Sequence, residues 1–567
     1  MDIWSHIISY FSLVFSKESL LELLSYDNEK PLIFTQFYFW GFFAVVLLIY
    51  SIIYKKKGLR NSYLFLVSLF FYYKTSGLFV FILLFSTFSD YIIGGLIYRS
   101  SEKWKQQILV GLSVFINLSV LCYFKYAYFF TNAYNQFVEE KLHVFNHFAY
   151  WTNSLTGSHF EVDKILLPVG ISFYTFQTIS YSVDVYKKRV KPVKNILDFG
   201  FYVSFFPQLV AGPIVRASEF IPQLYKPYVL SKKQFGLALF WILNGLIKKV
   251  VIGDYIAVNF IDRVFDNPML FSGLENLFAL YGYSLQVYAD FSGYTDIAIG
   301  VALLMGFYLP TNFNSPYKAK NVGEFWKRWH MSLSTWLKDY LYIPLGGNRA
   351  GSIATYLLFF MMVGIVVLLS GKMWVLLLCL WIILMLAFLA YFSKKFRNWL
   401  NTNINLLITM LLGGLWHGSS WQFVIWGGLN GLGLMVFKLW KKISPYGKSK
   451  HWLAKVWMIF ITFNFITFTR IWFRAETMQS TKEIIQQIST HFQPQLFMDI
   501  ITSYSNVFIF MLVGYFIHWL PVKTKQWYRI TFIKLPLAVQ AIITIIAVFG
   551  IYQAMSSDMV PFIYFQF

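Results

Sequence analysis

Long apolar runs follow one another along most of the chain, separated by short polar stretches. A helix that spans a membrane needs about 20 mostly apolar residues, and thirteen runs of that length, or slightly shorter, occur from residue 33 onwards. Several runs are interrupted, so we expect about eleven true spans, together with re-entrant or interfacial helices. The pattern predicts an all-α polytopic membrane protein. The runs are 33–54, 62–73, 77–98, 108–130, 165–186, 235–262, 276–307, 353–371, 373–392, 404–437, 453–473, 505–521 and 534–555.

The two ends of the chain differ from the apolar core, which extends over residues 33–473. Residues 3–15 place aromatic and aliphatic side chains at helical spacing. This spacing predicts a helix in the membrane interface, or a first short span, within an N-terminal segment 1–32. Residues 474–504 form a long polar stretch ahead of the last apolar runs. We therefore regard 474–567 as an additional loop followed by C-terminal transmembrane helices.

Two runs contain backbone that cannot continue as an ordinary helix. Two prolines lie within residues 207–213, and proline removes a backbone donor and clashes with the preceding turn. A glycine-rich break at 413–420 contains His417. Its apolar flanks, 404–416 and 421–437, are about 20 and 25 Å long as helices, whereas a bilayer core is about 30 Å thick. Broken backbone at membrane depth persists only where it is buried in protein or lines a wet cavity, so we expect His417 at that depth.

The composition excludes the soluble classes of protein. Of the 567 residues, 57% are hydrophobic and only 13% are charged, about half the charged share of a soluble domain. The net charge of +22 is explained by cationic cytoplasmic loops rather than by nucleic-acid binding. Loops 55–60 and 187–194 carry only basic charges, whereas 1–32 and 131–164 are net acidic. We expect the basic loops in the cytoplasm and the acidic segments outside.

The sequence carries no signature of a metal or cofactor site. Cys122 and Cys379 lie far apart in separate apolar runs, which implies neither a metal cluster nor a disulfide framework. P-loop, Rossmann, zinc-protease and serine-hydrolase motifs are absent from the sequence. We therefore expect no metal and no bound cofactor.

Two histidines fall where an ionisable side chain is costly, which makes each a candidate functional residue. His330 lies among aromatic and basic residues, and His417 lies in the glycine-rich break. Histidine is well suited to accept and return a proton near neutral pH. The competing interpretation is a histidine satisfied by a buried hydroxyl or carbonyl. His518, beside Trp519 and Pro521 near a helix end, is expected at the membrane interface.

Other polar residues concentrate between 286 and 349. Asp290 and Asp296 lie in an apolar run, and we expect them to pair with lysine or arginine rather than to act as an acid–base pair. Lys248, Lys249 and Asp254 are further charges inside an apolar run. Cations then alternate with aromatic residues, as in an interfacial helix or in a pocket for a phosphorylated donor. The candidates for such a pocket are Trp326, Arg328, Trp329, Asp339, Asn348 and Arg349.

The ordered set of motifs resembles the membrane-bound O-acyltransferase family, and within it the bacterial alginate O-acetylation type. The strongest are Phe-Trp-Lys-Arg-Trp-His-Met-Ser, which contains His330, and Gly-Gly-Leu-Trp-His-Gly-Ser-Ser, which contains His417. Any one motif is weak, but together they extend over most of the chain. The matching stretches are 167–177, 206–214, 245–254, 288–300, 325–337, 339–349, 413–421 and 562–567.

The resemblance implies a membrane core with a central tunnel and roles for individual residues. His417 corresponds to the catalytic histidine and acts as general base, and His330 corresponds to the second motif histidine. Trp416 and Ser419, with the candidates of the 286–349 region, are expected to position substrate. The donor is implied to be cytoplasmic acetyl-CoA, or an acyl carrier protein. The acetyl group is implied to cross a bacterial inner membrane to a partner transferase that modifies an extracytoplasmic polysaccharide, alginate or another envelope glycan.

Two alternatives differ in donor or in class. The D-alanyl transfer proteins of teichoic acid synthesis are similar and use a carrier-protein thioester, but those chains are shorter. A transporter would also use broken helices and buried charges. It predicts an inverted repeat, and the sequence shows none.

Overall fold

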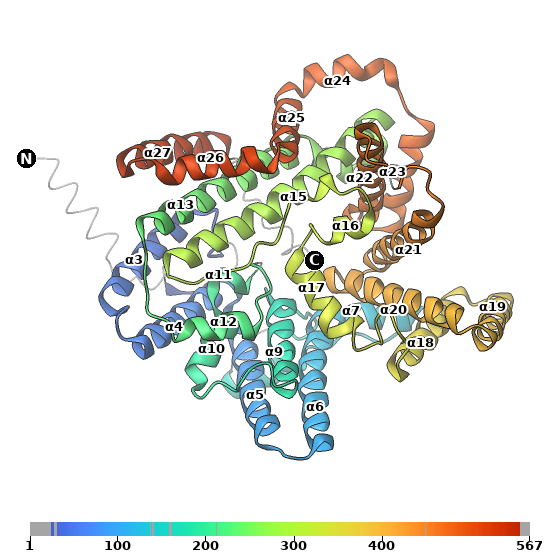
Figure 1. The fold of residues 1–567 in the computed structure, drawn as a ribbon, viewed down its shortest axis with the longest axis horizontal. Coiled ribbons are helices and arrows are strands. Elements are labelled where there is room, and N and C mark those ends of the chain that lie inside the picture. Colours follow the sequence, from blue (N-terminus) through green and yellow to red (C-terminus); the bar gives the residue numbers. More distant parts are fainter. Residues whose placement is uncertain are drawn as a thin grey trace, which may run out of the picture. The chain divides into compact units, whose positions relative to one another are not determined.

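The computed structural model describes residues 24–27, 31–136, 138, 141–157, 161–210, 212–447 and 449–555. Its regular elements are all helices, and the described residues form no strand (Figure 1). The helix predicted over 3–15 and the motif at 562–567 lie outside the described residues. The chain divides into two compact units, one of residues 1–242 with 297–309 and one of residues 243–296 with 310–567.

The first unit is organised around α9 (Ile171–Tyr186), whose residues are almost all buried. Helices α5 (Val80–Arg99) and α6 (Lys103–Leu121) pack against it. Between these three helices Asp90 is fully buried and accepts hydrogen bonds from Ser113, Asn117 and Ser182. The other elements are α3 (Phe37–Ile53), α4 (Lys57–Ser76), η1 (Gly77–Phe79), η2 (Cys122–Tyr126), α7 (Ala127–Asn135), α8 (His147–Thr156), α10 (Ile196–Ser204), α11 (Phe206–Leu209), α12 (Ala217–Leu224) and most of α13 (Lys232–Leu246).

The second unit carries both candidate histidines. It contains most of α15 (Gly273–Leu304), followed by an irregular segment with the short helices η6 (Pro316–Lys318), α16 (Val322–Trp326), α17 (Met331–Leu337) and η7 (Lys338–Tyr342). Its other elements are η3 (Ile247–Asp254), η4 (Ala257–Ile261), α14 (Asp262–Asp266), η5 (Pro268–Leu270), α18 (Ile353–Ser370), α19 (Met373–Phe392), α20 (Lys394–His417), α21 (Trp421–Ile443), α22 (Trp452–Arg474), α23 (Met478–Thr490), η8 (Pro494–Leu496), α24 (Phe497–Ser503), α25 (Ser505–Trp519), α26 (Val522–Lys534) and α27 (Leu537–Ala554).

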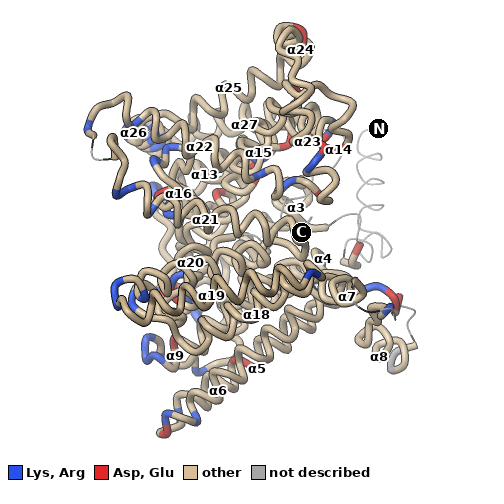
Figure 2. The backbone as a smooth tube through the Cα atoms, turned by 90° about the vertical axis from the view of Figure 1, so that its right-hand side faces the viewer, with Lys and Arg blue, Asp and Glu red and all other residues tan. Residues whose placement is uncertain are grey.

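The helices confirm a multi-pass membrane protein, although the expected count of about eleven spans is not confirmed. Eight helices in the described part are long and apolar enough to cross a bilayer, or nine if η8 and α24 form one bent span with α25. Helices α3 and α9 have 17 and 16 residues, fewer than the about 20 of a typical span. Helices α18 and α19 carry no lysine, arginine or acidic residue (Figure 2). Their apolar side chains are mostly exposed, as expected of a lipid-facing surface.

The proline-rich break has the predicted form. Helix α10 ends at Ser204, the short α11 carries Pro207 in its first turn and ends at Leu209, and the next helix, α12, begins at Ala217. Pro207 is tolerated there because the first turn of a helix does not need its backbone N–H.

The glycine-rich break is present, but the expectation of two short flanks is wrong. Helix α20 has 24 residues and begins at Lys394, well before the apolar run. Its polar part is partly accommodated inside the protein, because the buried Asn401 accepts from the hydroxyl of Tyr356 at 3.1 Å and the buried Asn403 donates to the carbonyl of Trp399 at 2.9 Å. His417 therefore lies at a turn between two full-length helices.

Helices α20 and α21 approach closely through two glycines that face each other. A Cβ atom on Gly414 would lie 2.3 Å from the carbonyl oxygen of Phe423, and one on Gly427 would lie 2.3 Å from that of Met410. Such distances leave no room for any side chain. The close contact fixes the end of α20, and thus the position of His417.

We predict that Gly427→Ala lowers the melting temperature of the purified protein in nanodiscs, followed by tryptophan fluorescence. Forcing an additional methyl into a packed contact costs about 1–3 kcal/mol. The matched control is Gly364→Ala in α18, where a Cβ would meet no atom within 4 Å. Equal melting temperatures for Gly427→Ala and wild type would contradict this account of the helix pair.

Candidate active site

His417 is the last residue of α20 and lies in an aromatic enclosure. It is 3% exposed, and the rings of Trp416, Trp426 and Phe473 lie 5.0, 5.0 and 5.6 Å from its imidazole. Gly418 is required next to it, because a Cβ atom there would lie 2.0 Å from the ring of Phe423. The local sequence thus encloses the imidazole among apolar ring faces.

His330 lies 6.4 Å from His417 between ring centroids, at the start of α17. Its φ is 43°, a left-handed backbone conformation that is costly for a residue with a side chain. Strained residues of this kind occur preferentially at functional sites. The side chain is fully buried and packs against Phe291 and Trp416.

The hydrogen bonds of Asn312 define the tautomer of His330. The Oδ1 atom of Asn312 accepts from the backbone N–H of Ser332 at 3.1 Å and from its hydroxyl at 2.9 Å. Because a backbone N–H is always a donor, the amide oxygen must face it. The same oxygen lies 3.2 Å from Nδ1 of His330, so Nδ1 carries the proton and Nε2 carries the lone pair. Burial lowers the pKa of His330 to about 3, which keeps the imidazole neutral at physiological pH.

A small cavity of about 10 Å³ adjoins His417, enough for about one water molecule. Besides aromatic rings, it is bordered by three polar side chains, Asn430, Thr469 and Arg470. The Oδ1 atom of Asn430 is buried without a hydrogen-bond partner among the described residues. The cavity therefore combines a candidate base, a cation and a hydrogen-bonding amide.

Arg470 is the functional candidate that the sequence interpretation missed. It is 4% exposed, lies 4.6 Å from the ring centroid of Trp329, and donates from Nη2 to the hydroxyl of Tyr317 at 3.0 Å. Within the described part of the chain, no carboxylate pairs with it, and its Nε has no hydrogen-bond partner. A buried cation without a counter-charge is costly. The position of this charge deep inside the apolar run 453–473 was the signal that could have identified it.

The two aspartates form ion pairs away from this cavity. Asp296 lies 2.7 Å from Nζ of Lys248, and Lys249 lies 2.5 Å from Asp290 and 2.7 Å from Asp254. This is the expected pairing with lysine. Neither aspartate borders the His417 cavity, so the structure does not bring them into this site.

The remaining sequence candidates divide into two groups. Trp329 borders the cavity, and Trp326 packs on Trp426 at 5.7 Å. The others do not border it. Arg328 pairs with Glu324 and Asp339 lies near Lys338, while Asn348, Arg349 and Ser419 are exposed. The described residues contain no group of three or more histidine, cysteine or acidic side chains that could hold a metal ion.

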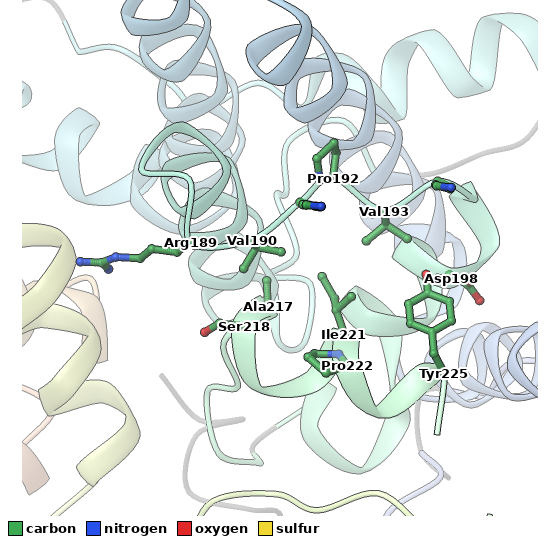
Figure 3. A pocket seen from close by; sticks show the side chains of 12 residues that line it. Arg189, Val190, Pro192, Val193, Asp198, Ala217, Ser218, Ile221, Pro222 and Tyr225 are labelled. Atoms are coloured by element: carbon green, nitrogen blue, oxygen red, sulfur yellow. Dashed lines mark hydrogen bonds between the residues drawn. The ribbon is translucent and has the colours of Figure 1, made fainter. Parts of the chain in front are cut away.

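A larger cavity of about 570 Å³ lies in the first unit. It lies between the basic loop that follows α9 and helix α12, and includes Val190, Val193 and Ile221 (Figure 3). Figure 3 shows Arg189 directed away from these apolar walls, and Arg189 pairs with Asp184 at 3.3 Å. This cavity contains neither candidate histidine.

Comparison with known proteins identifies the family of this chain. Residues 104–399 and 388–475 match the model of the membrane-bound O-acyltransferase family. A peptidoglycan O-acetyltransferase of Helicobacter pylori is 33% identical over 481 residues, which cover 80% of this chain and 78% of that protein. A protein of Azotobacter vinelandii named "Probable alginate O-acetylase AlgI" is 37% identical over 363 residues, covering 64% of this chain and 59% of that protein. The teichoic acid D-alanyltransferase of Bacillus subtilis is 29% identical over 309 residues, which cover 52% of this chain and 64% of that protein.

The match to this chain therefore covers less than two thirds of the length of the alginate O-acetylase and of the teichoic acid D-alanyltransferase. It covers more than two thirds of the length of the peptidoglycan O-acetyltransferase. The matched family region extends over most of the chain and includes the whole His417 cavity. This chain belongs to the membrane-bound O-acyltransferase family and is an O-acyltransferase.

Proposed function

We propose that this protein transfers an acetyl group from cytoplasmic acetyl-CoA for O-acetylation of an extracytoplasmic polysaccharide, with His417 as general base. The observation that carries the proposal is a small cavity bordered by both His417 and Arg470, a cation that no carboxylate among the described residues pairs with. The relatives named for peptidoglycan and alginate support a cell-envelope glycan as final acceptor. The proposed location is a bacterial inner membrane, with a partner transferase on the outer side.

The proposed reaction moves one acyl group and one proton. The imidazole of His417 takes the proton of the acceptor hydroxyl while that oxygen attacks the thioester carbonyl. A C–O bond forms, and the carbonyl electron pair moves onto oxygen. The C–S bond then breaks as this oxyanion collapses, and the departing thiolate takes the proton from the imidazolium. The product is an ester and a free thiol.

Arg470 is proposed to stabilise the oxyanion. A cation held in a water-poor site interacts strongly with charge that develops there, because little solvent screens it. The ring of Trp329 and the hydroxyl of Tyr317 hold the guanidinium without neutralising it. His330 is proposed as a positioning residue, since its neutral ring packs against Trp416 beside His417.

We predict that His417→Ala abolishes acetyl transfer. Protein in liposomes receives acetyl-labelled acetyl-CoA, and both free thiol and label on protein or on added de-O-acetylated glycan are measured. Removing a general base costs about 10²–10⁴ in rate. The matched control is the exposed His143→Ala, expected to retain wild-type turnover. Equal turnover in His417→Ala would place the chemistry elsewhere. Turnover of only a D-alanyl carrier thioester by wild type would favour the teichoic acid reaction.

We predict that Asn312→Leu lowers kcat at least about tenfold with little change in KM. The leucine side chain cannot accept a hydrogen bond from Nδ1 of His330, so the imidazole is no longer held in one tautomer. In other enzymes, a histidine in the wrong tautomer lowers kcat strongly. Asn312→Asp keeps an acceptor oxygen and is expected to restore most of the activity. Equal activity of the leucine and aspartate variants, with both folded, would refute a role for this hydrogen bond.

We predict that Arg470→Gln lowers kcat about 10²–10³-fold, the usual effect of removing an oxyanion donor. Arg470→Lys keeps the positive charge and is expected to retain part of the wild-type kcat. The matched control is Arg474→Gln on the same helix. Arg474 pairs with Asp262 at 3.2 Å and Asp266 at 3.1 Å, so its loss should lower the melting temperature but spare kcat. A similar kcat for both glutamine variants would show that Arg470 is structural.

A further inference from the structure

Three lysines from distant parts of the sequence meet around His518 at the end of α25. Lys525 of α26 donates to the carbonyl of His518 at 2.7 Å and to the hydroxyl of Ser315 at 2.9 Å. Lys318 of η6 donates to the carbonyl of Leu520 at 2.6 Å. Lys248 of η3 lies over the ring of Tyr288, which packs on His518 at 4.5 Å.

This lysine cluster (Lys248, Lys318 and Lys525) carries more positive charge than the protein neutralises. Lys248 pairs with Asp296. Within the described residues Lys318 and Lys525 pair with no carboxylate, and their hydrogen bonds go to neutral oxygens. Two charges thus remain in excess. Burial, together with the nearby Lys318 and Lys248, lowers the pKa of Lys525 to about 8. Ammonium groups held close together without acids are a typical setting for binding a phosphate.

His518 adds an unsatisfied donor to the same cluster. Its side chain is 2% exposed, and its Nε2 accepts the backbone N–H of Tyr317 at 3.2 Å. The proton therefore resides on Nδ1, which has no hydrogen-bond partner among the described residues. Buried donors are normally satisfied. A phosphate oxygen is an acceptor of the kind that this N–H lacks.

The cluster is connected to the His417 cavity through one short segment. Ser315, Tyr317 and Lys318 are close neighbours in sequence. Lys318 belongs to the cluster and Ser315 accepts from Lys525, whereas the Tyr317 hydroxyl accepts from Arg470. Ser315 has a φ of 45°, which is strained for serine. Figure 2 shows lysine and arginine positions on α26 and next to α16 on the same side of this unit. A ligand held at the cluster is therefore bound by the same segment that orients Arg470.

We propose that the lysine cluster, with His518, is a binding site for a phosphate group, and that its ligand is the phosphorylated arm of the thioester donor. Identifying the ligand as the donor rests on the proposed function, whereas the phosphate site itself does not. A lipid headgroup offers the same chemistry, so the experiment has to separate these two sources.

The test measures binding rather than turnover. The full-length protein is placed in phosphatidylcholine nanodiscs, and the Kd for free coenzyme A is compared with that for pantetheine, which lacks phosphate. The test variant is Lys318→Gln with Lys525→Gln. The matched control is Lys320→Gln with Lys523→Gln, which removes the same charge from the same two segments at exposed positions. A charge-preserving variant, Lys318→Arg with Lys525→Arg, checks for misfolding.

We expect wild type, the control and the arginine variant to bind coenzyme A, and the test variant to bind it at least tenfold more weakly. Pantetheine should bind weakly to all four. Stabilisation of wild type but not of the test variant by added phosphatidylglycerol, without coenzyme A binding, would identify a lipid phosphate as the ligand. Equal coenzyme A binding by test variant and control, or no response of wild type to either phosphate source, would overturn the site. His417→Ala should bind coenzyme A normally, so failure of the proposed catalytic role leaves this test unaffected.

Discussion

The unpaired charge of Arg470 is the constraint on which the arrangement of the active site depends. Inside a membrane protein, polar groups must be satisfied by the protein itself, because no bulk water is available. The chain meets this requirement elsewhere: Asp90 receives three side-chain donors, and Lys249 has two carboxylates. Arg470 receives only a ring face and a tyrosine hydroxyl. A cation that the fold holds in place but does not neutralise favours whichever bound state brings negative charge beside it, and in the proposed reaction that state is the oxyanion of acyl transfer.

The two histidines have different environments, and this separates their roles. His417 lies on the cavity wall at a helix end, where the Gly414–Gly427 contact sets its position. His330 does not border that cavity, and Asn312 determines which of its nitrogens carries the proton. A base must exchange a proton during each turnover. A ring fixed in one neutral tautomer is better suited to hold its neighbours in place. The geometry therefore favours His417 as the base and His330 as the support.

The sequence identified the parts of the site that depend on local pattern. The motif histidines, the break after His417 and the lysine partners of Asp290 and Asp296 could all be predicted, because each follows from a residue type placed in an apolar run. The start of α20 at Lys394 could not, because the polar stretch before the apolar run is partly buried through contacts distant in sequence, such as that of Asn401 with the hydroxyl of Tyr356. The expected count of about eleven spans is not confirmed, because apolar runs alone do not distinguish lipid-crossing helices from short buried ones. His518, expected at the interface, is buried because Tyr288 and Tyr317 pack against it.

Two of the lysines that contribute to the excess positive charge of the chain, Lys318 and Lys525 of the second unit, are not explained by membrane orientation alone. Many lysines and arginines lie in loops such as 55–56 and 187–194, as orientation in a membrane requires, and these are exposed. Lys318 and Lys525 differ because they are partly buried and hydrogen-bonded to neutral oxygens. Charges placed only for topology gain nothing from such partial burial, which weakens their hydration. Their arrangement is better explained by a ligand than by topology. Because Tyr317 lies between this cluster and Arg470, binding of a phosphorylated donor would order the segment whose tyrosine hydroxyl accepts from Arg470.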